Sequence, residues 1–296
     1  MSTPKTTNTP QEISSPISLL HTGLAFGEGP RWHNGALYFS DMHAYEVLRY
    51  QPTTGATSVV ATFDDEPSGL GWLPDGDMLV VAMSSKTLLR VHIEATTPTI
   101  STYADLSSLA AGRCNDMVVT PDGGAYVGNF GYDMHKGEKP AATDLLYVDP
   151  AGNVRAVADE LMFPNGTIIT PDGTTLVIAE TFGRRLTSYT LEADGSLSNR
   201  STWATLPEGA VPDGICLDAE GGIWVASPTS NDCLRLEQGG RVTHRVALDR
   251  GAFACMLGGT DLYILAAKSS RPEECKEQRA GQLLKVAAPF AGAGYP

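Results

Sequence analysis

The sequence is poor in basic residues, and it lacks long apolar runs and closely spaced cysteines. Lys and Arg number 21 against 34 Asp and Glu, which gives a net charge of −13 over 296 residues. A chain with this balance offers no basic face for a nucleic-acid backbone or an anionic membrane. No apolar run approaches the ~18 residues of a membrane-spanning helix. The five cysteines are odd in number, widely spaced and without a C-x-x-C pair, so we expect reduced, mostly buried thiols in a cytoplasmic protein.

A sustained helical period is also missing. Short β-rich runs alternate instead with turn signals, among them three Pro-Asp-Gly segments at residues 74–76, 121–123 and 171–173. Proline presets φ, aspartate forms local hydrogen bonds, and glycine accepts a positive φ, so each segment predicts a tight turn between strands. The pattern therefore predicts an all-β protein.

One unit of this pattern recurs six times along the chain. Its anchor positions are residues 29, 69, 116, 166, 214 and 256. Repeats of roughly 40–50 residues with up to four strands each predict a six-bladed β-propeller. The last unit is short of a strand, and residues 17–21 are expected to supply it and so close the ring. We expect a loose tail over residues 1–15 and one propeller domain over residues 16–296; a pair of β-sandwiches is the alternative, but it fits the repeat poorly.

Four polar residues share one position of this repeat, just before or at the first strand of a unit: Glu28, Asn115, Asn165 and Asp213. Equivalent positions of a ring converge on its axis at one end, so two carboxylates and two amides should meet there. Carboxylates crowded together repel one another unless a cation or a proton lies between them. Oxygen ligands favour Ca²⁺, Mg²⁺ or Mn²⁺, and a small number of protein ligands leaves room for water and substrate. The alternative is that the Asn-Gly and Asp-Gly pairs are ordinary turns.

Four segments together resemble a known family. They are Gly27-Glu-Gly-Pro-Arg-Trp32, Gly112-Arg-Cys-Asn-Asp116, Phe163-Pro-Asn-Gly166 and Val211-Pro-Asp-Gly-Ile-Cys-Leu-Asp218. In this order and spacing, over about residues 17–290, they are similar to the senescence-marker-protein/gluconolactonase/luciferin-regenerating-enzyme family. The resemblance implies a six-bladed propeller with one axial divalent cation. It also implies hydrolysis of sugar lactones or, more distantly, of organophosphates.

The resemblance also implies roles for individual residues. By motif, Glu28, Asn165 and Asp213 would hold the metal ion, and Asp213 would also act as the general base. Arg113 and Asn115 would contact the substrate. We expect the ion to be Ca²⁺, with Mg²⁺, Mn²⁺ and Zn²⁺ as alternatives.

One stretch departs from the family pattern. Gly128-Asn-Phe-Gly-Tyr-Asp133 stands where sugar lactonases tend to carry Gly-Thr followed by acidic residues. Asp133 falls where a contact with a substrate hydroxyl is expected, but it is shorter than Glu, and Phe130 and Tyr132 make this rim more aromatic, which leaves room for a less polar ester or lactone. Residues 135–144 are expected to form a flap over the mouth of the channel, and a disordered loop is the alternative.

The sequence thus predicts a divalent-metal-dependent hydrolase that opens a small lactone, either of the sugar type or less polar. The metal ion would polarise the carbonyl group while Asp213 accepts a proton from water. A phosphotriester hydrolase that uses the same metal site is one alternative. The other is a non-catalytic propeller platform for protein partners, but a platform does not require the axial carboxylates Glu28 and Asp213.

Overall fold

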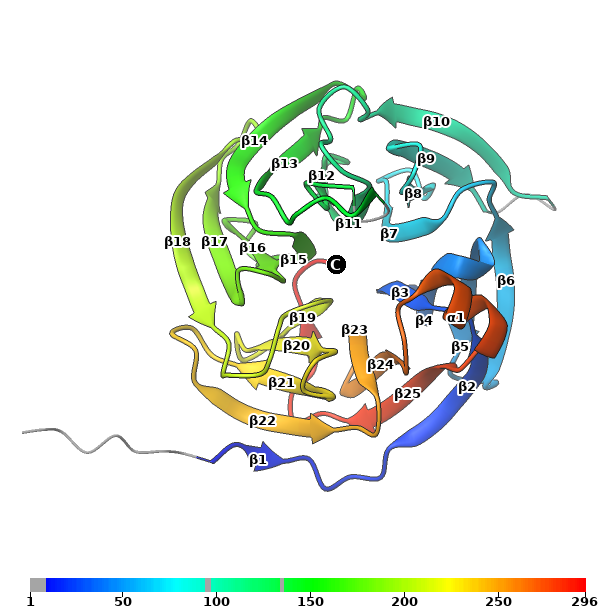
Figure 1. The fold of residues 1–296 in the computed structure, drawn as a ribbon, viewed down its shortest axis with the longest axis vertical. Helices are drawn as coiled ribbons and strands as arrows, with labels where there is room; N and C mark the ends of the chain where they lie inside the picture. Colours follow the sequence, from blue (N-terminus) through cyan, green and yellow to red (C-terminus); the bar gives the residue numbers. More distant parts are fainter. Residues whose placement is uncertain (1–8, 94–96, 134–135) are drawn as a thin grey trace, which may run out of the picture.

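The computed structural model describes residues 9–93, 97–133 and 136–296, and its strands form a ring of six sheets around a central axis (Figure 1). Each sheet contains four antiparallel strands, which are arranged side by side from the axis outward. The fifth sheet gains two further short strands, one from each terminal segment of the chain. The sheets are the blades of an all-β six-bladed β-propeller, as predicted from the six repeats. In this part of the chain no helix is long and apolar enough to cross a membrane.

The first three blades each begin at an inner strand beside the axis. Their strands are β3 (Gly27–His33), β4 (Ala36–Asp41), β5 (Glu46–Gln51) and β6 (Ala56–Thr62); β7 (Pro67–Trp72), β8 (Met78–Ala82), β9 (Thr87–His92) and β10 (Thr99–Asp105); and β11 (Cys114–Val119), β12 (Ala125–Asn129), β13 (Thr143–Val148) and β14 (Val154–Leu161).

The other three blades follow the same order. Their strands are β15 (Pro164–Ile169), β16 (Thr175–Glu180), β17 (Arg185–Leu191) and β18 (Leu197–Thr205); β19 (Ile215–Asp218), β20 (Ile223–Ser227), β21 (Asp232–Leu236) and β22 (Val242–Ala247); and β23 (Gly251–Gly258), β24 (Asp261–Ala267) and β25 (Gly281–Ala287).

The N-terminal segment closes the ring. Strand β2 (Ser18–Leu24) pairs antiparallel with β25 and becomes the outer strand of the sixth blade, in the register Leu24 to Gly281. This pairing confirms the closure predicted for residues 17–21. Strand β1 (Gln11–Glu12) pairs parallel with β22, so residues 11 and 12 of the predicted tail are strand-paired, whereas residues 1–8 lie outside the described part of the chain.

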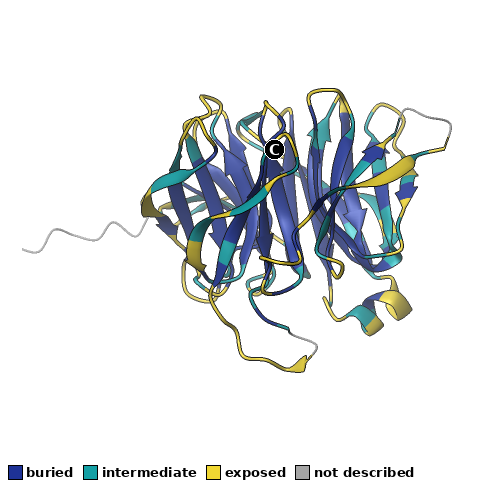
Figure 2. Cartoon of the chain, turned by 90° about the horizontal axis from the view of Figure 1, so that it is seen from above, coloured by how far each residue is buried: buried dark blue, intermediate teal, exposed yellow. Residues whose placement is uncertain are grey.

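The core lies between neighbouring blades. Separate apolar clusters fill the spaces between successive sheets, and these clusters contain mostly Val, Leu, Ile, Ala and Tyr side chains. Figure 2 shows the result as buried blades with exposed loops at the two ends and along the outer strands. All five cysteines are buried and unpaired, as predicted from their spacing.

The two ends of the propeller carry different elements. The short helices η1 (Met42–Ala44) and α1 (Pro272–Gln278) follow β4 and β24, so they lie at the end where the inner strands begin. The C-terminal segment crosses the opposite end, where β26 (Gly292–Ala293) pairs with β19 and Tyr295 pairs with Ile169 (Figures 1 and 2). A cavity of about 510 Å³ lies beside this segment and is lined by Trp32, Trp72 and Tyr295, among others.

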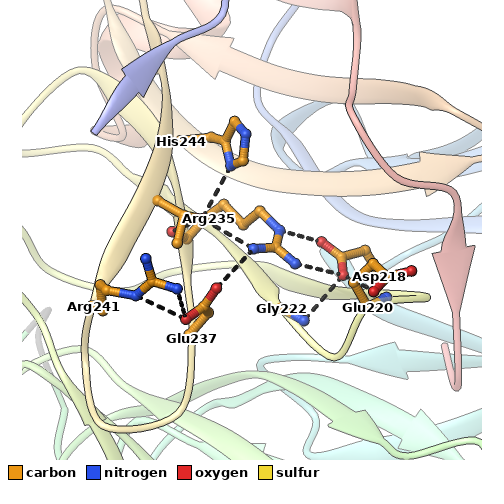
Figure 3. A network of polar contacts seen from close by, with 8 residues as sticks. Asp218, Glu220, Gly222, Arg235, Glu237, Arg241 and His244 are labelled. Carbon is orange, nitrogen blue, oxygen red and sulfur yellow. Dashed lines mark hydrogen bonds and ion pairs between the residues drawn. The ribbon is translucent and has the colours of Figure 1, made fainter. Parts of the chain in front are cut away.

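A buried ion pair supports the fifth blade beneath the C-terminal segment (Figure 3). The Arg235 Nε donates to Asp218 Oδ2 at 2.6 Å, and the Gly222 amide donates to Asp218 Oδ1 at 3.0 Å. The Arg235 guanidinium also lies 4.6 Å from the centre of the Phe290 ring. The turn between β19 and β20, strand β21 and the C-terminal segment are therefore linked through one arginine.

Candidate active site

The four candidate axial residues are buried at the start of the inner strands. Glu28, Asn115 and Asn165 lie in β3, β11 and β15, and Asp213 lies just before β19; each is 5–9% exposed. Ser68 holds the equivalent place in β7, and its Oγ donates to Asn115 Oδ1 at 3.4 Å. One polar side chain from each of five blades is thus positioned around the axis.

A β-bulge accompanies this position in the inner hairpins. The register between the first two strands shifts between Glu28 and Arg31, between Cys114 and Met117, and between Pro164 and Thr167. A bulge locally disrupts the ladder and turns a side chain away from the regular alternation of a strand. The bulges therefore explain how these polar residues leave the inter-blade core and face the axis.

Glycines next to these residues allow the inner strands to approach one another closely. A Cβ atom on Gly69 would lie 2.5 Å from the Met117 amide nitrogen, and one on Gly166 would lie 2.5 Å from the Ile215 nitrogen. Both distances are shorter than any real side chain tolerates next to backbone. The Asn-Gly pair at residues 165 and 166 is therefore a packing requirement of the ring and not a turn.

Both predicted metal-binding carboxylates have raised pKa values. Burial raises the pKa of Glu28 well above its ordinary value, and the negative charges of Asp213 and Asp116 raise it further. Burial likewise raises the pKa of Asp213, and Asp116 adds to the increase while a hydrogen bond from Asn165 opposes it. Buried carboxylates in this state are stabilised by a proton or by a cation between them.

The axial amides connect neighbouring blades. Asn165 Nδ2 donates a short hydrogen bond to Asp213 Oδ1 and a longer one, at 3.3 Å, to Thr181 Oγ1. Asn115 Nδ2 donates to the Pro164 carbonyl oxygen at 3.3 Å. The structure thus brings Glu28, Asn115, Asn165 and Asp213 into one polar group.

Arg31 and Asp116 lie next to this group, and the sequence did not assign either of them a role. Arg31 Nη2 donates to Asp116 Oδ1 at 2.6 Å, with side chains only 5% and 9% exposed. Its Nε donates to the Leu70 carbonyl oxygen at 2.9 Å. Arg31 therefore joins the first three blades and balances a third carboxylate near the axis. The position of Asp116 near the axis is predictable from the sequence, because Asp116 directly follows Asn115.

Arg113, a predicted substrate contact, is part of a second polar group. It forms a close ion pair with Glu66, whose other oxygen is 2.9 Å from His43 Nδ1. Burial alone would raise the pKa of Glu66, but the hydrogen bonds from His43 and Arg113 lower it to about 2. Glu66 is therefore ionised and fixes the guanidinium. No sequence pattern pairs His43 with Glu66, because the two residues belong to different blades.

Asp133, the other predicted substrate contact, lies in the loop after β12. Its Oδ2 is 3.0 Å from Lys136 Nζ, and its amide donates to Glu138 Oε2 at 2.8 Å. These contacts hold Asp133 within its own loop. Of the predicted flap at 135–144, His135 lies outside the described residues and residues 136–142 are exposed.

Aromatic side chains cover the same end of the propeller. Phe26, two residues before Glu28, packs edge-on against Phe253 with a ring separation of 4.7 Å. Phe130 packs against the apolar cluster that contains Phe26. Its ring also stacks on the Phe163 ring, with a centroid separation of 4.4 Å and an interplanar angle of 14°. The polar groups therefore lie beside an apolar surface.

The donor set at the axis fits a hard divalent cation. Glu28 and Asp213 supply buried carboxylates whose proximity is unfavourable without a positive charge, and Asn165 supplies an amide. Carboxylate and amide oxygens are the ligands that Ca²⁺ and Mg²⁺ prefer. Over residues 9–93, 97–133 and 136–296 no group of three or more His, Cys, Asp and Glu side chains is arranged as a metal site. The candidate metal site therefore requires the Asn165 amide oxygen as a ligand beside the two carboxylates.

Known proteins share this architecture. The chain is 28% identical to a 6-deoxy-6-sulfogluconolactonase of Pseudomonas putida over 86% of both chains. Its fold matches a luciferin-regenerating enzyme with a TM-score of 0.81 at 20% identity, covering 95% of this chain and 98% of that one. It also matches a calcium-binding protein, regucalcin, of Agrobacterium tumefaciens with a TM-score of 0.78 at 22% identity over 97% of each chain.

A family model spans most of the propeller. The model described as the SMP-30/Gluconolactonase/LRE-like region matches residues 26–269. This range contains all four motifs from which the resemblance was inferred, and it runs from the first blade into the sixth. The chain therefore belongs to the SMP-30/gluconolactonase/LRE-like family.

Proposed function

We propose that the protein is a lactone hydrolase that uses one divalent cation held by Glu28, Asn165 and Asp213. The observation that carries the proposal is the buried pair of carboxylates, Glu28 and Asp213, each with a raised pKa next to an amide. Similarity to a sulfogluconolactonase supports lactone hydrolysis as the reaction. Similarity to a calcium-binding regucalcin supports Ca²⁺ as the ion, with Mg²⁺, Mn²⁺ and Zn²⁺ as alternatives.

The chemistry divides between the ion and the side chains. When bound, the cation supplies a Lewis acid for the carbonyl oxygen of the lactone. Asp213 accepts the proton of the attacking water, a role that requires an ionised carboxylate. Arg113, fixed by Glu66, and Asn115 orient the ring of the substrate. Burial of these groups strengthens their interactions with the reacting atoms.

Replacement of Asp213 by Asn tests the proposal. An amide retains an oxygen for the ion but cannot accept a proton at neutral pH, so we expect kcat to fall by about 10²-fold or more at saturating Ca²⁺. Asn115→Ala is the matched comparison: it should lower kcat/KM while the ion stays bound. Metal content is measured beside lactone-opening kinetics for both variants.

A thermal experiment provides a second readout that does not depend on activity. A cation at 100 times its Kd stabilises a folded protein by about 2.7 kcal/mol, so Ca²⁺ should raise the Tm of the wild type in chelator-treated buffer. Asp213→Asn and Glu28→Gln should reduce this increase. Full turnover by verified metal-free protein, or near-normal turnover by Asp213→Asn with a filled metal site, would refute the proposed mechanism.

A further inference from the structure

Four aromatic rings from the third and fourth blades pack against one another in one continuous cluster at the active-site end. This aromatic wall consists of Phe130, Tyr132, Phe163 and Phe182. Phe163 is central, with ring separations of 4.4 Å to Phe130 and 4.8 Å to Phe182. Phe182 is 44% exposed. A bulky apolar ring with this exposure at the rim of a site is a surface that a ligand can cover.

The backbone holds the wall in a strained conformation. Phe163 has a φ of 60°, which is rare for a bulky side chain. The Phe163 carbonyl oxygen accepts from the Thr181 amide at 3.1 Å, and the Met162 amide donates to Glu180 Oε2 at 2.9 Å. Glu180 is fully buried and is held by Arg185 at 2.8 Å. Such strain persists where the surroundings enforce it, and it is concentrated at functional sites.

The wall is contiguous with the proposed catalytic residues. The Phe130 amide donates to the Arg113 carbonyl oxygen at 2.9 Å. Phe163 directly precedes Pro164 and Asn165, and a Cβ on Gly128 would lie 3.1 Å from the Pro164 oxygen. The end of β12 and the start of β15 are therefore closely packed, which places Phe130 beside the Arg113 backbone and Phe163 two residues before Asn165.

The polar side chains beside the aromatic wall are either paired with another residue or buried. Asp133, the residue placed to meet a substrate hydroxyl, is paired with Lys136. Tyr132 is only 7% exposed. A polyhydroxylated ring gains selectivity from several placed hydrogen-bond partners, whereas this wall offers mainly apolar ring surface.

We propose that the aromatic wall binds the non-reacting part of the substrate, and that this part is an uncharged aromatic ring joined to the lactone. The inference rests on the proposed lactone hydrolysis and specifies its substrate class. Aromatic rings pack favourably in offset or edge-to-face arrangements on other aromatic rings, and the exposed Phe182 provides the accessible ring. Phe182 and Phe130 are thus specificity-determining residues, whereas Asp213 performs the chemistry.

Two six-membered lactones test the inference. One is 3,4-dihydrocoumarin, in which the lactone is fused to a benzene ring, and the other is glucono-δ-lactone, which carries hydroxyl groups. Phe182→Ala and Phe130→Ala are compared with the wild type on each substrate, so that the intrinsic reactivity of the lactone cancels. Phe290→Ala is the matched control, because Phe290 is a partly exposed ring that packs on Arg235 at the opposite end.

We expect each wall variant to lose about tenfold in kcat/KM on dihydrocoumarin, the scale of one aromatic contact removed. The loss on glucono-δ-lactone should be much smaller, and Phe290→Ala should match the wild type on both substrates. Equal losses on the two lactones, or no loss on dihydrocoumarin, would overturn the inference and leave lactone hydrolysis intact.

A binding measurement separates failure of the inference from failure of the proposed function. The lactam 3,4-dihydro-2-quinolinone has the shape of dihydrocoumarin but resists hydrolysis, so its Kd is measured by calorimetry for the same variants. If neither lactone is hydrolysed but Phe182→Ala weakens lactam binding about tenfold, the wall binds aromatic ligands and the proposed reaction is wrong. If the lactam fails to bind, or binds equally to wild type and variants, the inference is wrong.

Discussion

Replacement of Arg31 by Met should destabilise the propeller more than any comparable change at an exposed ion pair. Arg31 donates to Asp116 Oδ1 at 2.6 Å, to the Leu70 oxygen at 2.9 Å and to the Pro30 oxygen at 2.8 Å. Methionine fills a similar volume but donates no hydrogen bond. The variant therefore leaves the Asp116 charge buried without its cation and removes a link among three blades.

The expected magnitude follows from the burial of the pair. Side-chain exposures of 5% and 9% place it in the class of buried ion pairs, where removal of one partner costs about 3–5 kcal/mol. The unfolding entropy is about 2.1 cal/mol/K per residue near 60 °C, so in a domain of about 280 residues 1 kcal/mol shifts the Tm by roughly 1.7 °C, and a decrease of about 5–8 °C is expected.

The assay is scanning calorimetry in chelator, so that a bound cation does not contribute to the Tm. Asp116→Asn removes the charge from the other side, and the double variant Arg31→Met/Asp116→Asn no longer contains an unpaired buried charge. The double variant should therefore be more stable than Arg31→Met alone, with a coupling within the usual range of about 0.5–3 kcal/mol.

Arg90→Met is the matched control. Arg90 is 38% exposed and pairs with Asp75 and Asp77. Asp77 keeps His92 as a partner when Arg90 is replaced, so the removal should cost about 1 kcal/mol. A decrease in Tm for Arg31→Met no larger than that of Arg90→Met would refute the reasoning. Additive effects in the double variant would show that the Arg31–Asp116 pair does not act as a unit.

Two further predictions concern acid stability and the packing of the inner strands. Glu66 has a folded pKa of about 2, below the ordinary value of 4.5, so its ion pairs stabilise the protein above pH 4.5 and this contribution is lost as the pH falls toward 2. The Tm of Glu66→Gln should consequently fall less between pH 5 and pH 2 than that of the wild type, and parallel curves would contradict this. Gly166→Ala should lower the Tm more than Gly209→Ala, because the new Cβ at position 166 lies 2.5 Å from the Ile215 nitrogen. At position 209 nothing lies within 4 Å, and alanine meets only the cost of a φ of 86°; equal effects would show that the close approach at position 166 costs no more than that backbone strain.

The sequence predicted the propeller because its signals are local and repeated. Each Pro-Asp-Gly segment specifies its own turn; in the segment at residues 121–123, for example, Gly123 has a φ of 94° and its amide donates to the Thr120 oxygen. Six repeats then determine the number of blades, and the shared repeat position predicts that Glu28, Asn165 and Asp213 lie near one another at the axis.

Contacts across blades were not predictable in the same way. His43 and Glu66 meet only because η1 of the first blade packs beside the start of the second. The positive φ of Phe163 depends on tertiary hydrogen bonds from the neighbouring turn. No spacing along the chain encodes either arrangement, since each arises from the curvature of the ring and from bulges that the alternation of residues does not reveal.

The pairing of β2 with β25 has a consequence for the order of events during protein synthesis. Leu24 is made 257 residues before its partner Gly281. At the usual rate of ~5–20 residues per second, β2 waits tens of seconds without its partner strand. Its exposed leucine at position 19 and its unpaired edge are then available to other chains. The ring therefore cannot close until β25 has been made, and the sixth blade is the last to be completed.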